Sequence, residues 1–327
     1  MLGGLVLVTG ATGLIGQGVA QALAQRGERV RALVRDVERA RGLLPAGVEL
    51  VRGDITEPAS LAPALRGARF AFHAAGMPEQ WQRDEASFDR VNREGTRHVL
   101  EASLTAGVRR VVYTSTMDVF AAPRGGTLSE AKIDPDPKPT AYERSKQAAE
   151  REAEAIARRG LEVVYINPSA VYGPSPHPTT TNAFIQRLLR RQVPALPPGG
   201  LSIAFREGVI QAHLAAAERG RAGERYLIAD EHLSVRQLAT LVLGAAPGSP
   251  RVPGDAPAWL VQLLATLSAP LARTFGFQPP IVPGELLFLL WNARVDASKA
   301  QRELGFTPTP AREGLRRTVE ALLATPG

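Results

Sequence analysis

Short apolar runs alternate with longer amphipathic segments through the first half of the chain. The first run, Gly4–Thr9, is continuously apolar, which is typical of a strand buried on both faces of a parallel sheet. Strict alternation of strand and helix predicts an α/β fold, a doubly wound parallel sheet with helices on both faces. We expect further strands at Arg29–Val34, Val48–Arg52, Arg69–His73, Arg109–Thr114 and Leu161–Asn167, and helices at Gly13–Arg26, Val37–Leu43, Glu57–Leu65, Asp84–Ala106 and Ala141–Arg159.

The pattern changes after Pro168, where further prolines divide the chain into short pieces. Arg225–Ile228 is one more apolar run and predicts a strand that returns to the edge of the sheet. From Leu233 onward the pattern is mainly helical, with connections rich in proline and glycine. We therefore expect a first domain at 1–173, with a returning segment near 203–230, and a smaller, mainly helical second domain at 174–327.

Two apolar stretches stand out in the second half, Ala258–Ala272 and Glu285–Trp291. Each is shorter than the roughly 18 residues that a membrane-spanning helix needs, and Pro270 interrupts the first. We interpret them as buried helices of the second domain, and contact with a membrane interface is the alternative. Because the first ten residues run directly into a strand and do not resemble a secretory leader, we expect a cytoplasmic protein without a membrane span.

Charge and cysteine content narrow the classes of function. The 39 basic and 32 acidic residues give a net charge of +7. Most of the basic residues are arginines scattered beside glutamates, which is typical of a solvated surface and not of a nucleic-acid site, although a modest positive field suits a phosphate-bearing ligand. The chain has no cysteine and its five histidines show no i, i+4 pair, so we expect no disulfide, no cysteine nucleophile and no metal site.

The run Gly10-Ala11-Thr12-Gly13-Leu14-Ile15-Gly16 lies between the first predicted strand and the first helix. One glycine at such a turn allows positive φ, a second lets the backbone approach a pyrophosphate, and a third lets helix and strand pack closely. The helix N-terminus adds free N–H groups and the positive end of a dipole. This context predicts a dinucleotide site on a Rossmann-type sheet, so we assign cofactor binding to 1–173 and substrate binding to 174–327. A tight turn without a ligand is the alternative.

The end of the second strand predicts which dinucleotide binds. NAD sites usually carry an acidic residue there, about 20 residues after the glycines, which bonds the ribose 2′-hydroxyl. This chain has Val34 followed by Arg35, and a guanidinium suits a 2′-phosphate. We predict NADP(H) in preference to NAD(H), with pairing of Arg35 to Asp36 or Glu38 as the alternative. Asp54, after the third strand, could accept from the adenine amino group or cap the next helix.

Tyr142 and Lys146 are four residues apart at the start of a predicted helix and therefore share one face. A free phenol has a pKa of about 10, and we expect a nearby ammonium and an oxidised nicotinamide to lower the pKa of Tyr142. The phenol can then exchange a proton with a substrate oxygen while hydride moves to or from carbon. The lysine can also bond the nicotinamide ribose. A pair on a surface helix is the alternative.

Hydroxyl-bearing and small residues end two neighbouring strands. Tyr113-Thr114-Ser115-Thr116 ends the fifth strand at the carboxyl edge of the sheet, where ligands bind, and a hydroxyl there can hold the substrate oxygen beside Tyr142. His73-Ala74-Ala75-Gly76 ends the fourth strand with small residues against which a cofactor can lie flat. We expect His73 itself to be packed and not catalytic. Loop capping and a tight turn are the respective alternatives.

Together these motifs resemble the extended short-chain dehydrogenases/reductases, also called the NAD-dependent epimerase/dehydratase family. The resemblance covers essentially the whole chain, and the motifs are specific as an ordered set. The segments that carry it are Gly10–Gly16, Asp54, His73–Gly76, Asn92–Thr96, Tyr113–Thr116, Tyr142–Lys146, Asn167–Pro174 and Asp296–Phe306.

The resemblance implies roles for particular residues. Thr116 assists Tyr142 and Lys146 in catalysis, with Ser115 as the fallback. Asn92 orders backbone around the cofactor. The helices at 84–106 and 141–159 form the interface of a homodimer. The residues expected to bind the cofactor are Gly10, Thr12, Gly13, Leu14, Ile15, Gly16, Arg35, Asp54, Ile55, Ala74, Ala75, Gly76, Asn92, Thr114, Tyr142, Lys146, Pro168 and Val171.

Two enzyme classes compete on this scaffold. A reductase, similar to dihydroflavonol reductases and 3β-hydroxysteroid dehydrogenases, would reduce a ketone or aldehyde or oxidise the alcohol. Nucleotide-sugar epimerases and dehydratases usually carry an asparagine at the position of Ala170 and an aspartate at that of Gly208, and a dehydratase would want more acids than Asp118. We favour the reductase; a non-catalytic dinucleotide sensor is a third hypothesis, disfavoured because Tyr142 and Lys146 are present. Side chains on segments expected to face the substrate are Trp81, Phe120, His177 and Phe184.

Overall fold

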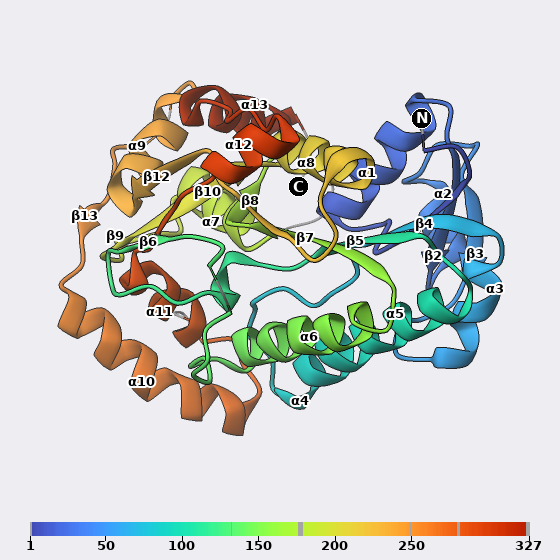
Figure 1. Cartoon of the computed structure of the whole chain (residues 1–327). Coiled ribbons are helices and arrows are strands. Elements are labelled where there is room, and N and C mark those ends of the chain that lie inside the picture. Colours follow the sequence, from blue (N-terminus) through green and yellow to red (C-terminus); the bar gives the residue numbers. More distant parts are fainter. Residues whose placement is uncertain (1, 132, 176–178, 249, 280–281, 325–327) are drawn as a thin grey trace.

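The centre of the protein is a parallel sheet of seven strands. The computed structural model describes residues 2–131, 133–175, 179–248, 250–279 and 282–324. Across the sheet the strand order is β11-β7-β5-β4-β1-β2-β3, and each neighbouring pair is parallel, so the predicted doubly wound α/β fold is confirmed (Figure 1). The strands are β1 (Leu5–Thr9), β2 (Arg29–Val34), β3 (Glu49–Arg52), β4 (Ala68–His73), β5 (Arg110–Thr114), β7 (Glu162–Pro168) and β11 (Arg225–Ile228).

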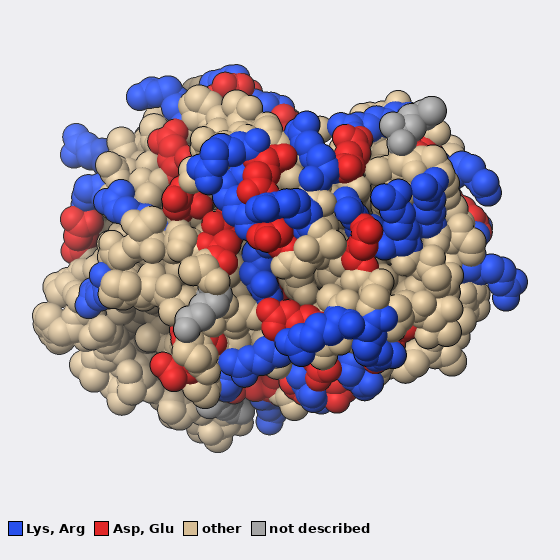
Figure 2. Space-filling view, viewed as in Figure 1, with Lys and Arg blue, Asp and Glu red and all other residues tan. Residues whose placement is uncertain are grey.

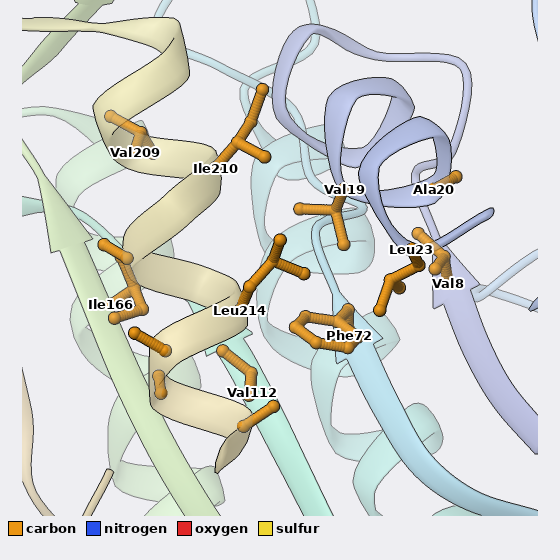
Figure 3. Close-up of a cluster of buried hydrophobic side chains, with 14 of the residues drawn as sticks. Val8, Val19, Ala20, Leu23, Phe72, Val112, Ile166, Val209, Ile210 and Leu214 are labelled. Atoms are coloured by element: carbon orange, nitrogen blue, oxygen red, sulfur yellow. The ribbon is translucent and has the colours of Figure 1, made fainter. Parts of the chain in front are cut away.

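Helices cover both faces of this sheet. Along β1, Val6 and Val8 join the core that packs under α1 and α8, whereas Leu7 joins the core under α3, α5 and α6, as the two-residue period of a strand requires. Figure 3 shows the first of these cores, in which side chains of α1 and α8 meet those of the strands. The helices are α1 (Leu14–Gln25), α2 (Val37–Arg41) and α8 (Arg206–Arg219), and α3 (Leu61–Leu65), α5 (Gly95–Thr105) and α6 (Ala141–Ala157).

The helix expected at Asp84–Ala106 is built from three pieces. A short α4 (Ala86–Phe88) leads into a π-helical stretch, Asp89–Glu94, and α5 follows. A π-helical insertion is rare and often marks a functional site. Asn92 lies on this stretch and is buried. The wider turn therefore places an amide side chain below the loop that follows β4.

A second, three-stranded sheet lies beside the first, in the order β12-β10-β8. Its strands are not evident in the sequence pattern, because prolines and glycines bound the short apolar run of β10. This half of the chain is mainly helical, as expected, with this small sheet as an addition, and the division at residues 173 and 174 stays a prediction. The elements here are β8 (Ala170–Tyr172), β10 (Gly200–Phe205) and β12 (Glu231–Ser234), packed with α7 (Thr180–Leu189), α9 (Val235–Gly244) and α13 (Ala311–Ala324), and the two-residue strands β6 (Thr127–Leu128), β9 (Ala195–Leu196), β13 (Gly254–Asp255) and β14 (Arg294–Val295).

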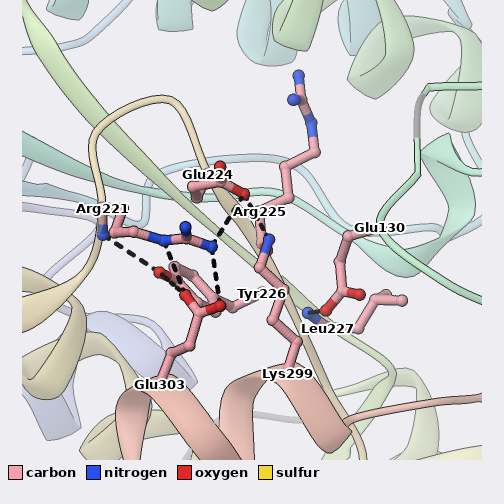
Figure 4. Close-up of polar contacts among 8 residues, drawn as sticks. All are labelled: Glu130, Arg221, Glu224, Arg225, Tyr226, Leu227, Lys299 and Glu303. Atoms are coloured by element: carbon pink, nitrogen blue, oxygen red, sulfur yellow. Dashed lines mark hydrogen bonds and ion pairs between the residues drawn. The ribbon is translucent and has the colours of Figure 1, made fainter.

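The C-terminal part of the chain returns to the edge of the large sheet. Helix α12 (Ser298–Leu304) docks on β11 through charged and polar side chains (Figure 4). Lys299 Nζ donates to a carboxylate oxygen of Glu224 at 2.6 Å, and the Tyr226 hydroxyl donates to Glu303 at 2.9 Å. The second half of the sequence is thus threaded through the first, and the loops that reach the carboxyl edge of the sheet come from both.

Helices α10 (Ala258–Phe275) and α11 (Pro283–Trp291) form the outermost layer (Figure 1). Val261 and Ala265 of α10 pack on Leu286 and Leu290 of α11 in a small cluster of their own. The opposite face of α10 is open to solvent, so the expectation of a buried helix is wrong for α10: both faces of the large sheet are already covered, and α10 packs chiefly on α11. No helix in the described part of the chain is long and apolar enough to cross a membrane.

A buried ion pair joins α6 to the edge strand β11. Arg225 Nε contacts Glu150 at 2.6 Å, and a second nitrogen of the same guanidinium contacts Glu154 at 2.6 Å. Glu150 is fully buried, and its other oxygen accepts from Asn167 Nδ2 at 2.7 Å. Removing the arginine would leave a buried carboxylate without its counter-charge, which is costly.

We therefore predict that Arg225→Leu lowers the free energy of unfolding by about 3 kcal/mol, because Glu150 loses its partner. The matched control is Arg221→Leu, which removes an exposed arginine that pairs with Glu303, and should cost at most about 1 kcal/mol. Urea unfolding of the three proteins measures both values. Equal losses for the two variants would contradict a structural role for the buried pair.

Candidate active site

A cavity of about 450 Å³ opens at the carboxyl edge of the large sheet. Ligand sites of open α/β sheets lie at this edge. The lining comes from the loops after β1, β4, β5 and β7, from the first turns of α6, and from α7, α9 and α11. The predicted site residues among the lining are Gly13, Leu14, Ile15, Ala74, Ala75, Gly76, Thr114, Ser115, Thr116, Tyr142, Lys146, Pro168 and Val171.

The glycine loop has the conformation that a phosphate loop needs. Gly10 has φ of +68°, and a Cβ there would lie 2.5 Å from backbone atoms of Ala74 and Ala75. A Cβ on Gly16 would lie 2.2 Å from the carbonyl oxygen of Gly10, whereas one on Gly13 would meet that oxygen at 3.4 Å. Helix α1 begins directly after Gly13 without a side-chain cap, so the N–H groups of its first turn are available to an anion. The loop therefore fits a dinucleotide.

The end of β2 leaves one arginine without a partner. Asp36 caps α2 by accepting from the backbone of Arg39, and Glu38 pairs with Arg41 at 2.7 Å. Arg35 is exposed and forms no hydrogen bond or ion pair with any residue that the structure describes. Asp54 accepts from the backbone and hydroxyl groups of Thr56 at 2.9 Å and does not cap the next helix. The structure therefore shows neither a pairing of Arg35 with Asp36 or Glu38 nor a helix cap by Asp54.

A capping box fixes the first turn of α6, where the phenol lies. Thr140 Oγ1 accepts from the Glu143 N–H at 3.1 Å, and the Glu143 carboxylate accepts from the Thr140 N–H at 3.0 Å. This reciprocal pair satisfies two backbone donors and sets where the helix begins. Tyr142 therefore enters the cavity from a defined turn, with its ring packed edge-on against Phe88.

The Tyr142 phenol is held in its protonated form. Burial raises the pKa of Tyr142 well above its ordinary value, the Asp118 carboxyl acts in the same direction, and a hydrogen bond with Thr116 opposes them. The expectation that Lys146 lowers this pKa is not met in the protein alone. Its Nζ donates instead to the Thr114 carbonyl at 2.9 Å and to the Tyr113 hydroxyl at 3.2 Å.

Lys146 is buried and lies one helical turn beyond Tyr142. Burial lowers the pKa of Lys146 to about 8, although the carboxylates of Glu150 and Asp118 oppose the shift. The ammonium is thus anchored to the end of β5 and lines the cavity. From this position it could reach a cofactor ribose, as the sequence predicts.

Asp118 lies in the site, although in the sequence it is only a single acid after the hydroxyl motif. Its Oδ2 accepts from Thr116 Oγ1 at 2.7 Å, while its Oδ1 is buried without a partner among the described residues. Burial raises the pKa of Asp118 to about 7, and Glu143 adds to the shift. The Thr116 hydroxyl, which the phenol of Tyr142 also contacts, is therefore oriented by a neighbouring carboxyl group. Ser115 lines the cavity but has no such contact to Tyr142, so Thr116 is the better match to the predicted third group.

Two further carboxyl groups line the cavity and have no local signature in the sequence. Glu79, from the loop after β4, accepts from Thr140 Oγ1 at 3.1 Å, and burial raises its pKa to about 8. Glu285 lies in the first turn of α11, and burial raises its pKa as well. Lys146 is the one cationic side chain in the lining, counting only residues that the structure describes. The lining is therefore mainly apolar, and its described residues offer Lys146 but no arginine to a bound anion.

Asn92 and His73 support the site from below. Asn92 Oδ1 accepts from the Met77 N–H at 2.7 Å, and its Nδ2 donates to the Met77 carbonyl and to Ser145 Oγ, each at 3.0 Å. The amide thus orders the loop after β4 and ties it to α6. His73 is fully buried between the hydroxyls of Thr9 and Thr96, which agrees with the expectation that it is packed.

Most of the remaining predicted residues lie outside the cavity lining or outside the described residues. Ile55 is buried beneath α5, and a Cβ on Gly95 would lie 2.7 Å from its side chain. Phe184 lines the cavity, Phe120 belongs to a separate core cluster, and His177 lies outside the described residues. The predicted cofactor residues that do not line the cavity are Gly10, Thr12, Gly16, Arg35, Asp54, Ile55 and Asn92.

Comparisons with known proteins agree with this geometry. The model of the NAD dependent epimerase/dehydratase family matches residues 6–229. The chain is 34% identical over 310 residues to sterol demethylase protein B of Methylococcus capsulatus, covering 94% of each protein. It is 31% identical over 319 residues to a putative dihydroflavonol 4-reductase of Synechocystis sp., covering 95% of this chain and 92% of that one. Among solved structures it is similar to MoeE5 in complex with UDP-glucuronic acid and NAD, with a TM-score of 0.75 and 25% identity over 97% of this chain and 98% of that one.

The glycine loop gives a prediction that separates folding from cofactor binding. Gly13→Ala should leave the melting temperature unchanged, since there is room for a methyl group, but should weaken dinucleotide binding by at least about tenfold, because the methyl lies where a pyrophosphate must approach. Gly16→Ala should lower the free energy of unfolding by roughly 1–3 kcal/mol, because its methyl overlaps the Gly10 carbonyl. Thermal unfolding and a fluorescence titration with NADPH test both. Unchanged affinity in Gly13→Ala would show that the loop does not bind the cofactor.

Proposed function

We propose, since the chain belongs to the NAD-dependent epimerase/dehydratase family, that it is an NADP(H)-dependent reductase of an apolar ketone or aldehyde, able to run in reverse on the alcohol. The observation that carries the proposal is the placement of Tyr142 beside Thr116 in a cavity whose lining is otherwise mainly apolar. The same cavity reaches the N-terminus of α1, where the cofactor phosphates would lie.

The chemistry divides between the cofactor and three side chains. A bound reduced nicotinamide supplies hydride to the carbonyl carbon. Tyr142 donates its phenolic proton to the carbonyl oxygen, which gives the alcohol and the oxidised cofactor. Thr116 holds that oxygen beside the phenol, and Lys146, one helical turn away, stabilises the phenolate that remains after proton donation until solvent returns a proton.

The protonation state of Tyr142 supports the reductive direction. A phenol with a raised pKa is protonated at neutral pH and is ready to donate. When Asp118 is ionised, its carboxylate accepts a hydrogen bond from the Thr116 hydroxyl. When Asp118 is protonated, the Thr116 hydroxyl is free to donate its hydrogen bond to the substrate oxygen. Asp118 is thus a positioning residue for Thr116 in this proposal.

The charges of the cavity favour an apolar substrate over a nucleotide sugar. A diphosphate binds through cationic side chains, and the described lining residues offer it Lys146 but no arginine. Gly208, where sugar enzymes are expected to carry an aspartate, packs against Phe306 and does not line the cavity. The names of the relatives at 34% and 31% identity, a sterol demethylase protein and a putative dihydroflavonol 4-reductase, also indicate polycyclic substrates.

The alternative is a nucleotide-sugar epimerase or dehydratase. The similarity to MoeE5, whose structure holds UDP-glucuronic acid and NAD, favours it. At 25% identity that protein shares the fold and does not have to share the substrate.

Two finer parts of the proposal concern the cofactor and the assembly. We infer a preference for NADP(H), because Arg35 is exposed at the end of β2 and free to bind a 2′-phosphate, with NAD(H) as the alternative cofactor. We also infer a cytoplasmic homodimer that packs α5 and α6 against the same helices of a second copy. The family resemblance supports that assembly.

Replacing the phenol tests the catalytic assignment. We predict that Tyr142→Phe lowers kcat for NADPH-dependent reduction of an apolar polycyclic ketone by about a hundredfold to ten-thousandfold, because the proton donor is lost. The affinity for NADPH should change little. The matched control is Tyr165→Phe, whose hydroxyl is buried without a partner and lies outside the cavity.

Turnover of the ketone and of a UDP-sugar is measured for the wild type and for both variants. Turnover of the ketone by the wild type and by Tyr165→Phe, but not by Tyr142→Phe, is the expected result. Turnover of a UDP-sugar but of no ketone would overturn the reductase in favour of the epimerase.

Replacing Arg35 tests the cofactor preference. Arg35→Ala should raise the Kd for NADPH by roughly tenfold to a hundredfold, since charge-assisted hydrogen bonds to the 2′-phosphate are lost, and should leave the Kd for NADH unchanged. Arg41→Ala is the control, because Arg41 is an exposed arginine nearby that pairs with Glu38. The preference for NADP(H) fails if both variants bind NADPH equally well.

A further inference from the structure

Helix α10 presents an open apolar face along its whole length. Trp259 is 66% exposed, Leu267 59% and Phe275 74%. Exposed apolar patches of this kind are uncommon on soluble proteins and mark contacts with another surface. The large apolar side chains exposed on α10 and just after it are Trp259, Leu263, Leu264, Leu267, Leu271, Phe275 and Phe277.

Helix α10 has two apolar faces, an inner face that packs on α11 and an outer face that is exposed. Val261 and Ala265 are buried against Leu286 and Leu290 of α11. On the outer side Leu263, Leu267 and Leu271 recur every four residues, so they form one stripe. An 18-residue helix is about 27 Å long, so the stripe is a narrow ridge and not a broad flat face.

Helix α10 itself contains no acidic residue, and the exposed Asp255 just before it pairs with Arg236. Residues 256–284 contain no aspartate or glutamate and one basic residue, Arg273, whereas 22% of the whole chain is charged. Exposed arginines lie near both ends: Arg251 precedes the helix, and a nitrogen of Arg83 lies 3.9 Å from where a Cβ on Gly276, at its C-terminal end, would be. Figure 2 shows an uncharged expanse at the lower left, where Figure 1 places α10.

We propose that α10 binds the surface of a membrane that contains anionic lipids. The helix lies in the plane of the interface with its ridge among the acyl chains, and arginines at its two ends meet the headgroups. Long interfacial helices combine an apolar face with basic flanks in this way, and tryptophan is a preferred residue at that depth. The net charge of +7 complements an anionic surface.

The position of α11 links this surface to the cavity. Leu286 and Leu290 of α11 pack on α10, while Phe288 and Leu289 of the same helix line the cavity. The cavity therefore lies one helix away from the proposed membrane contact. An apolar substrate dissolved in the bilayer would have a short path to Tyr142; this last step rests on the proposed function, whereas membrane binding does not.

Sedimentation of the full-length protein with lipid vesicles tests the proposal without cofactor or substrate. We expect binding to vesicles of phosphatidylcholine and phosphatidylglycerol in equal parts, and weaker binding to phosphatidylcholine alone. The combined variant Leu263→Gln, Leu267→Gln and Leu271→Gln should lower the partition coefficient by at least about tenfold. Because these side chains are exposed, the variant should keep the melting temperature of the wild type.

Leu323→Gln is the matched control, since Leu323 is 56% exposed on α13, and this variant should bind vesicles like the wild type. Tryptophan emission should shift to the blue on vesicle binding, and the shift should be lost in Trp259→Phe, which should still sediment. Tyr142→Phe should also sediment normally, which separates a failure of the proposed reaction from a failure of membrane binding.

Two results would overturn the proposal. One is a wild-type protein that does not sediment with the mixed vesicles. The other is a dimer in solution that the triple leucine variant converts to monomers, because the ridge would then bind a second copy of the chain.

Discussion

The hydrogen bond from Lys146 Nζ to the Thr114 carbonyl, at 2.9 Å, joins helix α6 to the carboxyl end of β5. This junction fixes the buried face of α6 against the sheet. Tyr142 and Glu150 lie four residues to either side of Lys146 on the same helix face. Their side chains reach three places: the cavity, the central strand β5, and the edge strand β11 through Arg225. One buried polar stripe on a single helix thus ties the reactive phenol to the sheet.

Burial, and not charge pairing, sets the protonation states around this stripe. It raises the pKa values of Tyr142 and of Asp118 and lowers that of Lys146, so each charged form is disfavoured. The result is a cavity bounded mainly by apolar side chains, with the Tyr142 phenol and the glycine loop both in its lining. That combination suits proton donation to a neutral carbonyl group and does not suit a diphosphate, which explains why we place substrate specificity with the reductases.

The elements of the first half could be predicted because their patterns are local. The apolar run of β1, the glycines before α1 and the four-residue spacing of Tyr142 and Lys146 each carry their own periodicity. Other features depend on contacts between distant segments. Glu79 and Glu285 meet at the cavity from positions more than 200 residues apart, and no local pattern marks either as a site residue. Likewise the apolar composition of α10 predicts burial, but only the packed structure shows that both faces of the sheet are already covered and that half of the helix faces outward.

The central claim is net hydride transfer from the cofactor to an apolar carbonyl compound. Its most direct test uses NADPH that carries deuterium at carbon 4 of the nicotinamide, incubated with polycyclic ketones and, separately, with UDP-sugars. We predict that deuterium appears on the carbinol carbon of the alcohol, with one oxidised cofactor formed per molecule of product. A UDP-sugar that changes configuration while the cofactor shows no net oxidation, with no label in any alcohol, would contradict the account.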